Sequence, residues 1–349
     1  MNPPPVLPPL PDLGSDVDEF LSRPSAALVA SAGRWSGPFL VLGAGGKMGL
    51  HLAGMLQRAL RAAGRPERVI AVSRFATLRD RAAFDAQGVE TLACDLSVPA
   101  AVEALPDAAA MFFLAGAKFG TSGDPALLRR INAEMPRLVA ERYRRARVVA
   151  FSTGCVYPFV SPASGGAAET APVDPRPGEY AASCLERERA FADAAARHGT
   201  AVALIRLNYA VEFRYGVLVD IASRVWRGEP IDVTTGYVNV IWQPDAIDLS
   251  LRALDLAAAP AVPVNVSGPQ ILRVRELAEE FGRLFGKPVT VVGKEAETAW
   301  LSDASWVRQR LGAPPTPVAT MQRWIAAWLG QGGGTWGKPT AFERRDGQF

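Results

Sequence analysis

Short apolar runs alternate with amphipathic segments from residue 39 to residue 207, and this alternation constrains the fold more than any other feature of the chain. Between the apolar runs, apolar residues recur at helical spacing, which predicts helices there. Strands that alternate with helices form crossover units, and these build a parallel sheet covered by helices on both faces. The sequence therefore predicts an α/β fold with a doubly wound parallel sheet. The expected strands are 39–42, 69–72, 91–93, 111–114, 148–151 and 202–207, and the expected helices are 48–63, 79–86, 100–105, 125–145 and 180–198.

A cluster of glycines follows the first expected strand and opens the first expected helix. The segment reads Gly43-Ala44-Gly45-Gly46-Lys47-Met48-Gly49. Glycines permit a tight turn here, and they let the free N–H groups of the helix N-terminus approach a pyrophosphate. Because the motif lies at the start of a series of crossover units, it predicts a Rossmann-type dinucleotide site. The expected cofactor contacts in this segment are Gly43, Gly45, Gly46, Lys47, Met48 and Gly49.

The end of the second expected strand indicates which dinucleotide is preferred. A site for NAD usually places a carboxylate there, which accepts hydrogen bonds from the ribose 2′-hydroxyl. This chain has Ser73 and Arg74 at that point, and the next acidic residue is Asp80. Since a guanidinium can bind a 2′-phosphate with two hydrogen bonds, we expect NADP to be preferred over NAD. After the third strand, Asp95 and Leu96 are expected at the adenine edge.

Beyond residue 207 the alternation weakens, and this change divides the chain. A Rossmann-type domain is expected over 36–210, with 241–266 returning to it, and a smaller C-terminal substrate lobe is expected over 211–240 and 267–330. The first 35 residues are expected as a Pro-rich tail and an N-terminal helical extension, and 331–349 as a flexible tail. The further expected elements are helices at 217–226, 241–256, 274–284 and 321–329 and strands at 264–266 and 289–292.

Charge and composition argue against several classes of partner. The chain has 38 Lys and Arg against 35 Asp and Glu, with both signs spread along it. This is not the basic pattern typical of proteins that bind nucleic acid or a membrane surface, and no apolar run reaches the roughly 18 residues of a membrane span. Three cysteines and two histidines, without metal-ligand spacing, indicate a cytoplasmic protein with neither a disulfide framework nor a metal site. We expect both histidines, His51 and His198, on helix surfaces.

Further motifs follow the later strands. Ala115-Gly116 and Lys118 follow the fourth strand, Asn132 lies on the next helix, and the fifth strand leads into Ser152-Thr153-Gly154-Cys155-Val156-Tyr157. Together with Gly43, Gly46, Gly49 and Asp95-Leu96, these segments resemble the extended short-chain dehydrogenase/reductases, which include the NAD(P)-dependent sugar epimerases and dehydratases. The resemblance covers about residues 38–330. It implies that Ala115 and Gly116 lie along the cofactor and that Thr153 is a catalytic hydroxyl.

The helix that follows carries the family's catalytic tyrosine but departs from its pattern four residues later. The family uses Tyr-x-x-x-Lys, in which the tyrosine is the acid/base and also borders the cofactor. The lysine, on the same helical face, holds the ribose and lowers the tyrosine pKa. Here Tyr180 is followed by Cys184. A tyrosine without a nearby cation has a pKa of about 10 and is neutral at pH 7. Such a group can donate a proton in a reduction but is a poor base for the reverse reaction.

Three interpretations of Cys184 remain open. In the first, a cation from elsewhere, Lys118 or else Arg187, replaces the lysine, and the protein is an oxidoreductase or a sugar epimerase or dehydratase with a retained cofactor. In the second, Cys184 marks altered chemistry at Tyr180. In the third, the fold binds NADP(H) without turnover and acts as a regulatory or scaffold protein. We expect an NAD(P)-dependent oxidoreductase acting on a carbonyl or hydroxyl group, with Thr153, Tyr180, Cys184 and Lys118 as its catalytic residues.

The resemblance also bears on the substrate. Nucleotide-sugar enzymes of the family usually carry an Arg-Asp pair ahead of the aspartate that corresponds to Asp245, and here the pair is Val238 and Asn239. Because this change removes a phosphate clamp, we expect a small sugar-like or polyhydroxylated substrate rather than a nucleotide sugar.

Partners and contacts follow from the same resemblance. Family members often dimerise through helices that correspond here to 125–145 and 180–198, so we expect a homodimer. The expected substrate contacts, against the C-terminal lobe, are Tyr157, Asn208, Tyr209 and Arg214.

Overall fold

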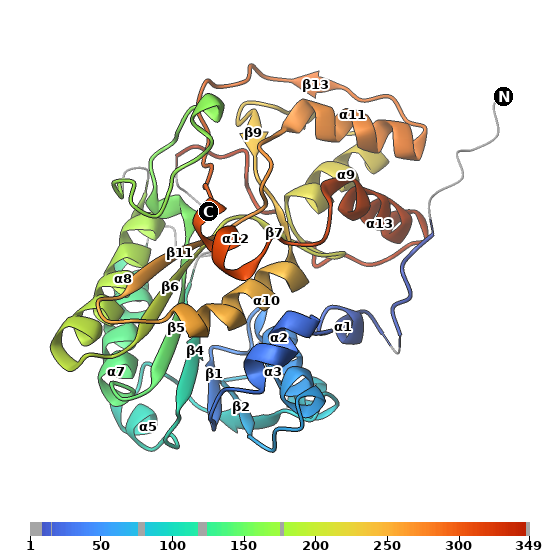
Figure 1. Ribbon diagram of the computed structural model, residues 1–349. Coiled ribbons are helices and arrows are strands. Elements are labelled where there is room, and N and C mark those ends of the chain that lie inside the picture. The colour runs from blue at the N-terminus through green and yellow to red at the C-terminus, as the bar shows by residue number, and fades with distance from the viewer. Residues whose placement is uncertain (1–8, 15, 76–80, 118–123, 175–177, 347–349) are drawn as a thin grey trace.

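A seven-stranded parallel sheet forms the centre of the molecule in the computed structural model (Figure 1). The structure describes residues 9–14, 16–75, 81–117, 124–174 and 178–346. The strands of the sheet are β1 (Phe39–Leu42), β2 (Val69–Ser73), β3 (Glu90–Ala93), β4 (Ala110–Phe113), β5 (Arg147–Thr153), β6 (Val202–Leu207) and β11 (Val262–Val266). Their order is β11-β6-β5-β4-β1-β2-β3, with all neighbours parallel, which confirms the predicted doubly wound fold.

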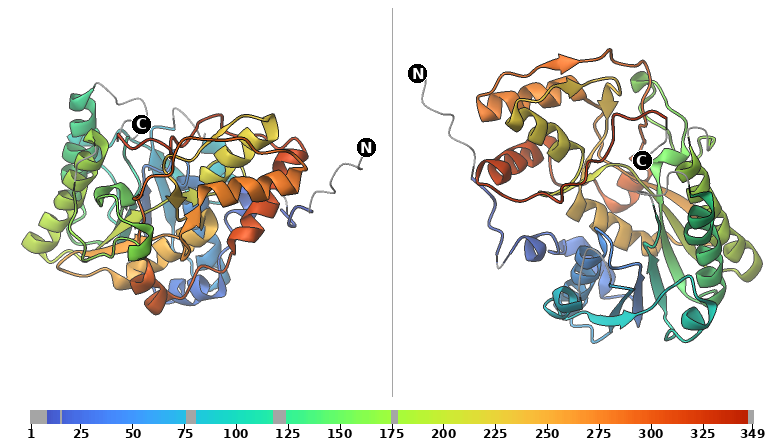
Figure 2. Two further views of the ribbon diagram at one scale, coloured as in Figure 1. Left: turned by 90° about the horizontal axis from the view of Figure 1, so that it is seen from above. Right: turned by 180° about the vertical axis from the view of Figure 1, so that it is seen from behind.

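Helices cover both faces of this sheet, because side chains along each strand point alternately to opposite sides. In β1, Phe39 and Val41 pack into one apolar core, and Leu40 and Leu42 pack into another. The first core is covered by α2 (Ala26–Ala32), α3 (Gly49–Ala62), α4 (Arg81–Asp85) and α10 (Gln243–Arg252), and the second by α5 (Pro99–Glu103), α7 (Met135–Arg142) and α8 (Glu179–His198) (Figures 1 and 2).

The helix expected over 125–145 is interrupted. It consists of α6 (Pro125–Arg129), a π-helical segment (Arg130–Glu134) and α7. The π-helical segment contains Asn132, whose side chain is fully buried and bonds the backbone of Ala117. A π turn within a helix is often found at a functional site, and hydrophobic periodicity does not reveal it.

The carboxyl ends of β1 and β4 meet at the point where the strand order reverses. In a doubly wound sheet the crevice at such a point is where ligands bind. Here Gly43 follows β1 and Ala115 follows β4, and the two backbones lie in close contact. The glycine turn is therefore placed at the crevice.

A smaller lobe stands above the sheet. Its core is formed by α9 (Val217–Arg227), α11 (Val274–Phe285) and α13 (Val318–Gly330), which pack on one another (Figure 1). The sequence also places the residues of α12 (Ser305–Leu311) in this lobe. In the structure α12 instead belongs with the large sheet, because its Val307 packs into the core of that sheet. Two-stranded pairs complete the fold: β7 (Ala210–Val211) with β10 (Ile241–Trp242), β8 (Ile231–Asp232) with β13 (Val291–Val292), and β9 (Tyr237–Val238) with β12 (Leu272–Arg273). Short 3-10 turns lie at Gly154–Val156, Pro162–Ser164 and Ala253–Leu256.

The N-terminal extension docks on the main domain through α1 (Val17–Phe20) and α2. The expectation that His51 lies on a helix surface is wrong, because the docked extension and α10 cover it completely. Its Nδ1 accepts a hydrogen bond from Gln243 (2.7 Å), and its Nε2 bonds Asp18 of α1 (2.8 Å). Its counterpart His198 is exposed, as expected.

The segment expected as a flexible tail packs against the smaller lobe. We call residues 335–346 the C-terminal strap. Phe342 is only 2% exposed and lies in the core of the lobe. Beside it, Thr340 donates hydrogen bonds to Asp220 from its backbone N–H (2.7 Å) and its hydroxyl (2.6 Å). Glycines at 332–334 suggested flexibility, but the apolar and hydroxyl side chains that follow them anchor the strap.

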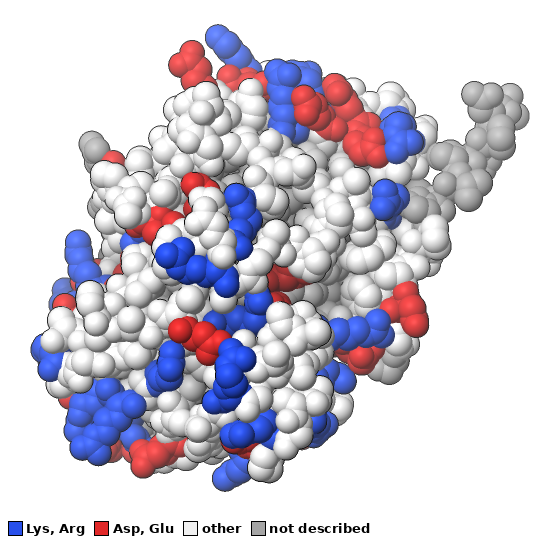
Figure 3. Space-filling view, in the orientation of Figure 1, with Lys and Arg blue, Asp and Glu red and all other residues white. Residues whose placement is uncertain are grey.

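The surface is mixed in charge. On the face shown in Figure 3, basic and acidic side chains are interspersed, without one large patch of a single sign. Within the described ranges, every helix is too short or too polar to cross a membrane.

Candidate active site

A cavity of about 620 Å³ opens at the carboxyl ends of β1, β4 and β5, below the smaller lobe. Its walls come from the glycine turn, the segments after β4 and β5, the start of α8, the segment after β6 and the C-terminal strap. The lining residues that the structure describes are Gly43, Gly45–Gly49, Leu114, Gly116, Ala117, Phe151–Thr153, Cys155, Tyr180, Leu207–Ala210, Tyr215–Val217, Gln243, Lys338 and Thr340.

The glycine turn has the geometry of a pyrophosphate cradle. Gly43 has φ of +81°, and a Cβ there would lie 2.4 Å from the backbone nitrogen of Ala115. Gly49, the first residue of α3, lies so close to the carbonyl of Ala44 that a Cβ would approach its oxygen to 2.1 Å. Only glycine fits at either position, and the result is an open helix N-terminus facing the cavity. These residues fit a bound dinucleotide.

The residues expected at the adenosine end lie just beyond the cavity. Arg74 is exposed at the end of β2, and Ser73 is half-buried against Gly45. Asp95 accepts hydrogen bonds from the backbone N–H and the hydroxyl of Ser97. These bonds lower the pKa of Asp95, and the nearby charge of Arg74 adds to the effect. Leu96 is buried in the core beneath them.

Thr153 and Tyr180 reach the cavity from different elements, at the end of β5 and in the first turn of α8. The Thr153 oxygen accepts a hydrogen bond from the N–H of Cys155 (3.2 Å), which leaves the hydroxyl hydrogen to point elsewhere. The neighbouring Ser152 hydroxyl instead donates to Glu188 (2.6 Å). Of these two hydroxyls, Thr153 is therefore the one suited to donate to a ligand.

Cys184 lies one turn along α8 from Tyr180, fully buried, and the two side chains share a hydrogen bond. Burial raises the pKa of Cys184, so its thiol is neutral at pH 7. Burial also raises the pKa of Tyr180 well above its usual value, Cys184 adds to the rise, and the charge of Arg187 opposes it. The tyrosine is accordingly a protonated phenol at neutral pH.

Arg187 lies on the same face of α8, seven residues after Tyr180, and is 5% exposed. It donates hydrogen bonds to the carbonyl of Phe151 (3.0 Å) and to Oδ1 of Asn132 (2.6 Å). The Nη2 atom lies so close to Gly116 that a Cβ there would meet it at 2.2 Å. Phe151 and Gly116 both line the cavity, so this guanidinium lies directly behind its wall.

No carboxylate pairs with Arg187 among the described residues. The next residue, Glu188, instead forms a buried ion pair with Arg206 (2.7 Å). The Nε atom of Arg187 is also buried without a hydrogen-bond partner in the described part of the chain. An unpaired buried charge is costly, so its position beside the cavity calls for a functional explanation.

A family model described as the NAD dependent epimerase/dehydratase family matches residues 39–233, which is more than half of the chain. The chain belongs to this family. It is a family of NAD-dependent enzymes, and this confirms the family resemblance seen in the motifs. No curated protein sequence matches the chain.

Solved structures of epimerases and dehydratases share the fold. The UDP-glucose 4-epimerase of Thermus thermophilus, solved with NAD, is 21% identical, with a TM-score of 0.69 over 84% of this chain and 99% of that one. WbmG of Bordetella bronchiseptica, solved with NAD and UDP, is 18% identical, with a TM-score of 0.69 over 86% of this chain and 96% of that one. DesIV, the dTDP-glucose 4,6-dehydratase of Streptomyces venezuelae, solved with NAD, is 18% identical, with a TM-score of 0.68 over 84% and 97%.

The epimerase/dehydratase motifs of the chain are thus brought together at one cavity, but not every expected site residue lies there. Asn208 and Tyr209 line it. Tyr157 is 1% exposed, and its hydroxyl bonds Asn265 and Arg206. Its surroundings are those of a core residue, not of a substrate contact.

Arg214 and Lys118 are also absent from the described cavity wall. Arg214 forms ion pairs with Asp18 (2.7 Å) and Glu212 (3.2 Å), so its guanidinium joins the N-terminal extension to the smaller lobe. Lys118, expected as a catalytic residue, lies outside the residues that the structure describes.

Other lining residues have no signal in the epimerase/dehydratase motifs. Gln243, Tyr215, Lys338 and Thr340 reach the cavity only because distant segments fold over it. Tyr215 does contact one of the motifs, because the ammonium group of Lys47 in the glycine turn lies 3.2 Å from the centre of the Tyr215 ring.

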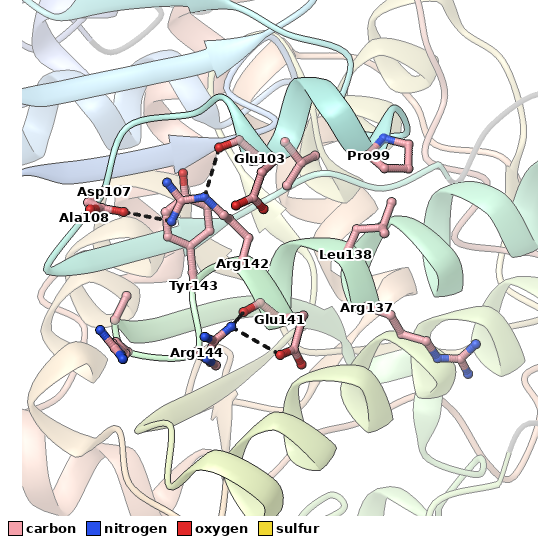
Figure 4. A pocket seen from close by; sticks show the side chains of 13 residues that line it. Pro99, Glu103, Asp107, Ala108, Arg137, Leu138, Glu141, Arg142, Tyr143 and Arg144 are labelled. Carbon is pink, nitrogen blue, oxygen red and sulfur yellow. Dashed lines mark hydrogen bonds and ion pairs between the residues drawn. The ribbon is translucent and has the colours of Figure 1, made fainter.

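A second cavity, of about 640 Å³, lies between α5 and α7 and is rich in arginine (Figure 4). Its polar groups are largely engaged with one another. Arg142 binds Asp107 and the carbonyls of Glu103 and Leu105, and Arg144 binds Glu141. This cavity contains none of the family motifs, and its contacts are those of a helix packed on its neighbour.

Proposed function

We propose that the protein is an NAD(P)-dependent oxidoreductase that reduces a carbonyl group of a small sugar-like or polyhydroxylated substrate, with Tyr180 as the proton donor. The observation that carries this proposal is the meeting of Tyr180 and Thr153 with the glycine turn at one cavity. A dinucleotide bound at the turn and a substrate at the two hydroxyls would then be neighbours.

In this reduction, the cofactor, Thr153 and Tyr180 have separate roles. A reduced nicotinamide dinucleotide held at the glycine turn would supply a hydride to the carbonyl carbon. As the carbonyl electron pair moves onto oxygen, Thr153 donates a hydrogen bond to that oxygen and Tyr180 transfers its phenolic proton to it. The phenolate left on Tyr180 then takes a proton from water to complete the cycle.

The direction of the reaction follows from the protonation state of Tyr180. Burial raises the pKa of this group, and the lysine that would counteract the rise is replaced by Cys184. A neutral phenol can donate a proton without prior loss of one, whereas alcohol oxidation needs the phenolate as base. Reduction at neutral pH is therefore the favoured direction.

Arg187 supplies part of the positive charge that the lysine would give, since the pKa of Tyr180 stays raised in its presence. Its guanidinium lies behind Gly116 and Phe151 and opposes the rise in the Tyr180 pKa. It also stabilises the phenolate that forms when the proton leaves. Its effect works through the cavity wall, so Arg187 is a positioning residue and not a catalytic one.

For the cofactor we propose a preference for NADP(H) over NAD(H). The exposed guanidinium of Arg74 at the end of β2 suits a 2′-phosphate. For the substrate we propose contacts with Asn208 and Tyr209, which line the cavity. A homodimer through α7 and α8 and a cytoplasmic location are likewise proposals.

A second candidate is a nucleotide-sugar epimerase or dehydratase that retains its cofactor. It is favoured by the fold shared with enzymes solved in complex with UDP. In such a cycle the same tyrosine must act first as base and then as acid, so it demands more of Tyr180 than a reduction does.

The test is NADPH oxidation by the wild-type protein with a panel of aldoses, ketoses and uronic acids, and in parallel the epimerisation of UDP-glucose. We expect reduction of a panel member, and Y180F should lower kcat at least about 100-fold while leaving NADPH affinity unchanged. Equal activity of Y180F would refute the role of Tyr180. Turnover of UDP-glucose alone would favour the second candidate.

Cys184 provides the complementary variant. If the wild type binds NADPH without turnover and C184K acquires activity, the protein is a binding protein that has lost catalysis. C184M is the matched control, because it adds a similar length of side chain without the charge.

A further inference from the structure

The C-terminal strap contributes one wall of the cavity, although it lies far outside the matched range 39–233. After α13 the chain turns back across the smaller lobe (Figure 2). Lys338 and Thr340 then line the same cavity as the glycine turn. The strap thereby adds a second lysine and a further hydroxyl to the Lys47, Thr153 and Tyr180 that the family motifs bring to the cavity.

Anchors on both sides fix the strap near the cavity. On one side of Lys338, the N–H of Trp336 donates to the carbonyl of Arg214 (3.1 Å). On the other side, Thr340 is bound to Asp220, and Glu343 forms an ion pair with Arg224 (2.7 Å). Held at both ends, the strap keeps Lys338 at the cavity.

An aromatic contact connects the strap to the glycine turn. Trp336 stacks on Tyr215, with ring centres 6.1 Å apart and planes 26° apart. Tyr215 in turn faces the ammonium group of Lys47 in the glycine turn. Two of the chain's five lysines, Lys47 and Lys338, therefore line one cavity, and Tyr215 lies in contact with both of their segments.

The charge of the lining has one sign. Among the described residues that line the cavity there is no Asp or Glu, while Lys47, Lys338 and the open N-terminus of α3 are all electropositive. Arg187 adds a further positive charge behind the wall. Such a lining favours a ligand with several negative charges near the glycine turn.

We infer that Lys338 of the C-terminal strap binds a phosphate group of the ligand in the cavity that it lines together with the glycine turn. Two sources of that phosphate share the same chemistry: the pyrophosphate of the nicotinamide dinucleotide and, under the second candidate function, the pyrophosphate of a nucleotide sugar. The strap then acts as a fixed second side of an anion site whose first side is the glycine turn. The inference rests on the dinucleotide site of the proposed function but not on catalysis by Tyr180.

The test compares K338A with wild type by titration with NADPH and NADH, and with UDP-glucose in the presence of saturating NADPH. Loss of one ammonium–phosphate contact at a solvent-accessible site should weaken binding about fivefold to tenfold at low salt and less at about 0.2 M salt. K338R, which keeps the positive charge, should bind these ligands about as tightly as wild type does. K294A is the matched control, since Lys294 is also exposed but lies outside the cavity lining.

The outcomes separate the two sources of phosphate. Weaker binding of both dinucleotides assigns Lys338 to the cofactor pyrophosphate, and weaker binding of UDP-glucose alone assigns it to a substrate phosphate. If K338A binds all three as tightly as wild type does, with an unchanged melting temperature, the inference is overturned. If wild type binds no nicotinamide dinucleotide, the proposed function falls and the inference with it.

Discussion

Arg187 shows how a single residue can carry information that a motif does not. The motif position for a lysine holds Cys184, yet a guanidinium lies one turn further along the same face of α8. From the sequence, Arg187 is only the weaker alternative to Lys118. Its burial, its bond to Asn132 and its contact with Gly116 depend on residues more than 50 positions away, which no local pattern encodes.

Removing this charge should alter the pH dependence of the reaction. We expect R187M to lower kcat for carbonyl reduction about 10- to 100-fold. The pH at which Tyr180 loses its proton should also rise, because the opposing positive charge is gone. The measurement is the pH profile of kcat for R187M and R187K, the latter keeping the charge.

R189M is the matched control for this variant. Arg189 lies on the same helix, but it is exposed and paired with Glu186. A purely structural role of Arg187 would lower the melting temperature and leave the pH profile in place. That result would contradict the electrostatic role.

At the scale of whole elements, the sequence predicted the strands of the large sheet to within two residues. Strands such as β1 are buried on both faces and read as continuous apolar runs, so their signal is strong. The predicted helices were right in type, but the π-helical segment around Asn132 was not foreseen. Asn132 in this segment bonds the backbone of Ala117, which precedes α6 in the same crossover unit, and hydrophobic periodicity carries no signal for such a contact.

The docking of α1 is a second feature that periodicity could not predict. Asp18 lies at the junction, where it accepts hydrogen bonds from His51 of α3 and from Arg214 of the smaller lobe. Burial raises the pKa of Asp18, but the bond with His51 and the charge of Arg214 outweigh it, and the net shift is strongly downward. The carboxylate is thus an ionised link between three elements.

Asp18 should therefore matter more for stability than its neighbours on α1. We expect D18N to lower the free energy of unfolding by about 2 kcal/mol at pH 7.5, because Arg214 and His51 lose a charged acceptor in a largely buried site. Urea unfolding measures the change. E19Q is the control, since Glu19 pairs with the more exposed Arg23 and should cost less than about 1 kcal/mol. Equal decreases in the free energy of unfolding of the two variants would show that the contacts of Asp18 stabilise the fold no more than an exposed ion pair does.

At the scale of the whole molecule, two buried groups should shape the dependence of stability on pH in opposite directions. Asp245 of α10 accepts a hydrogen bond from the N–H of Thr316, and so connects the sheet domain to the segment before α13. Burial raises the pKa of Asp245 to about 6, and the like charge of Asp248 contributes. Burial lowers the pKa of His51, and Arg214 adds to this, although Asp18 and Glu212 oppose it.

The signs follow from which state binds the proton more tightly. Asp245 binds its proton more tightly in the folded state. It therefore adds stability as the pH falls from about 6 to about 4 and adds none above that range. His51 binds its proton more tightly in the unfolded state, so stability is lost as the pH falls through about 6.5. The two effects partly cancel in the wild type.

Substituting Asp245 should separate them. We expect D245N to be more stable than wild type by about 1 to 3 kcal/mol at pH 7.5, because an amide keeps the acceptor for Thr316 without a buried charge. This advantage should vanish near pH 4, where Asp245 is protonated in the wild type. In D245N, the loss of stability that His51 causes as the pH falls is no longer offset by Asp245. Urea unfolding at a series of pH values measures both. D193N, which removes an exposed carboxylate, is the control. A constant difference between D245N and wild type across the whole range would mean that Asp245 does not titrate in the folded protein as its burial requires.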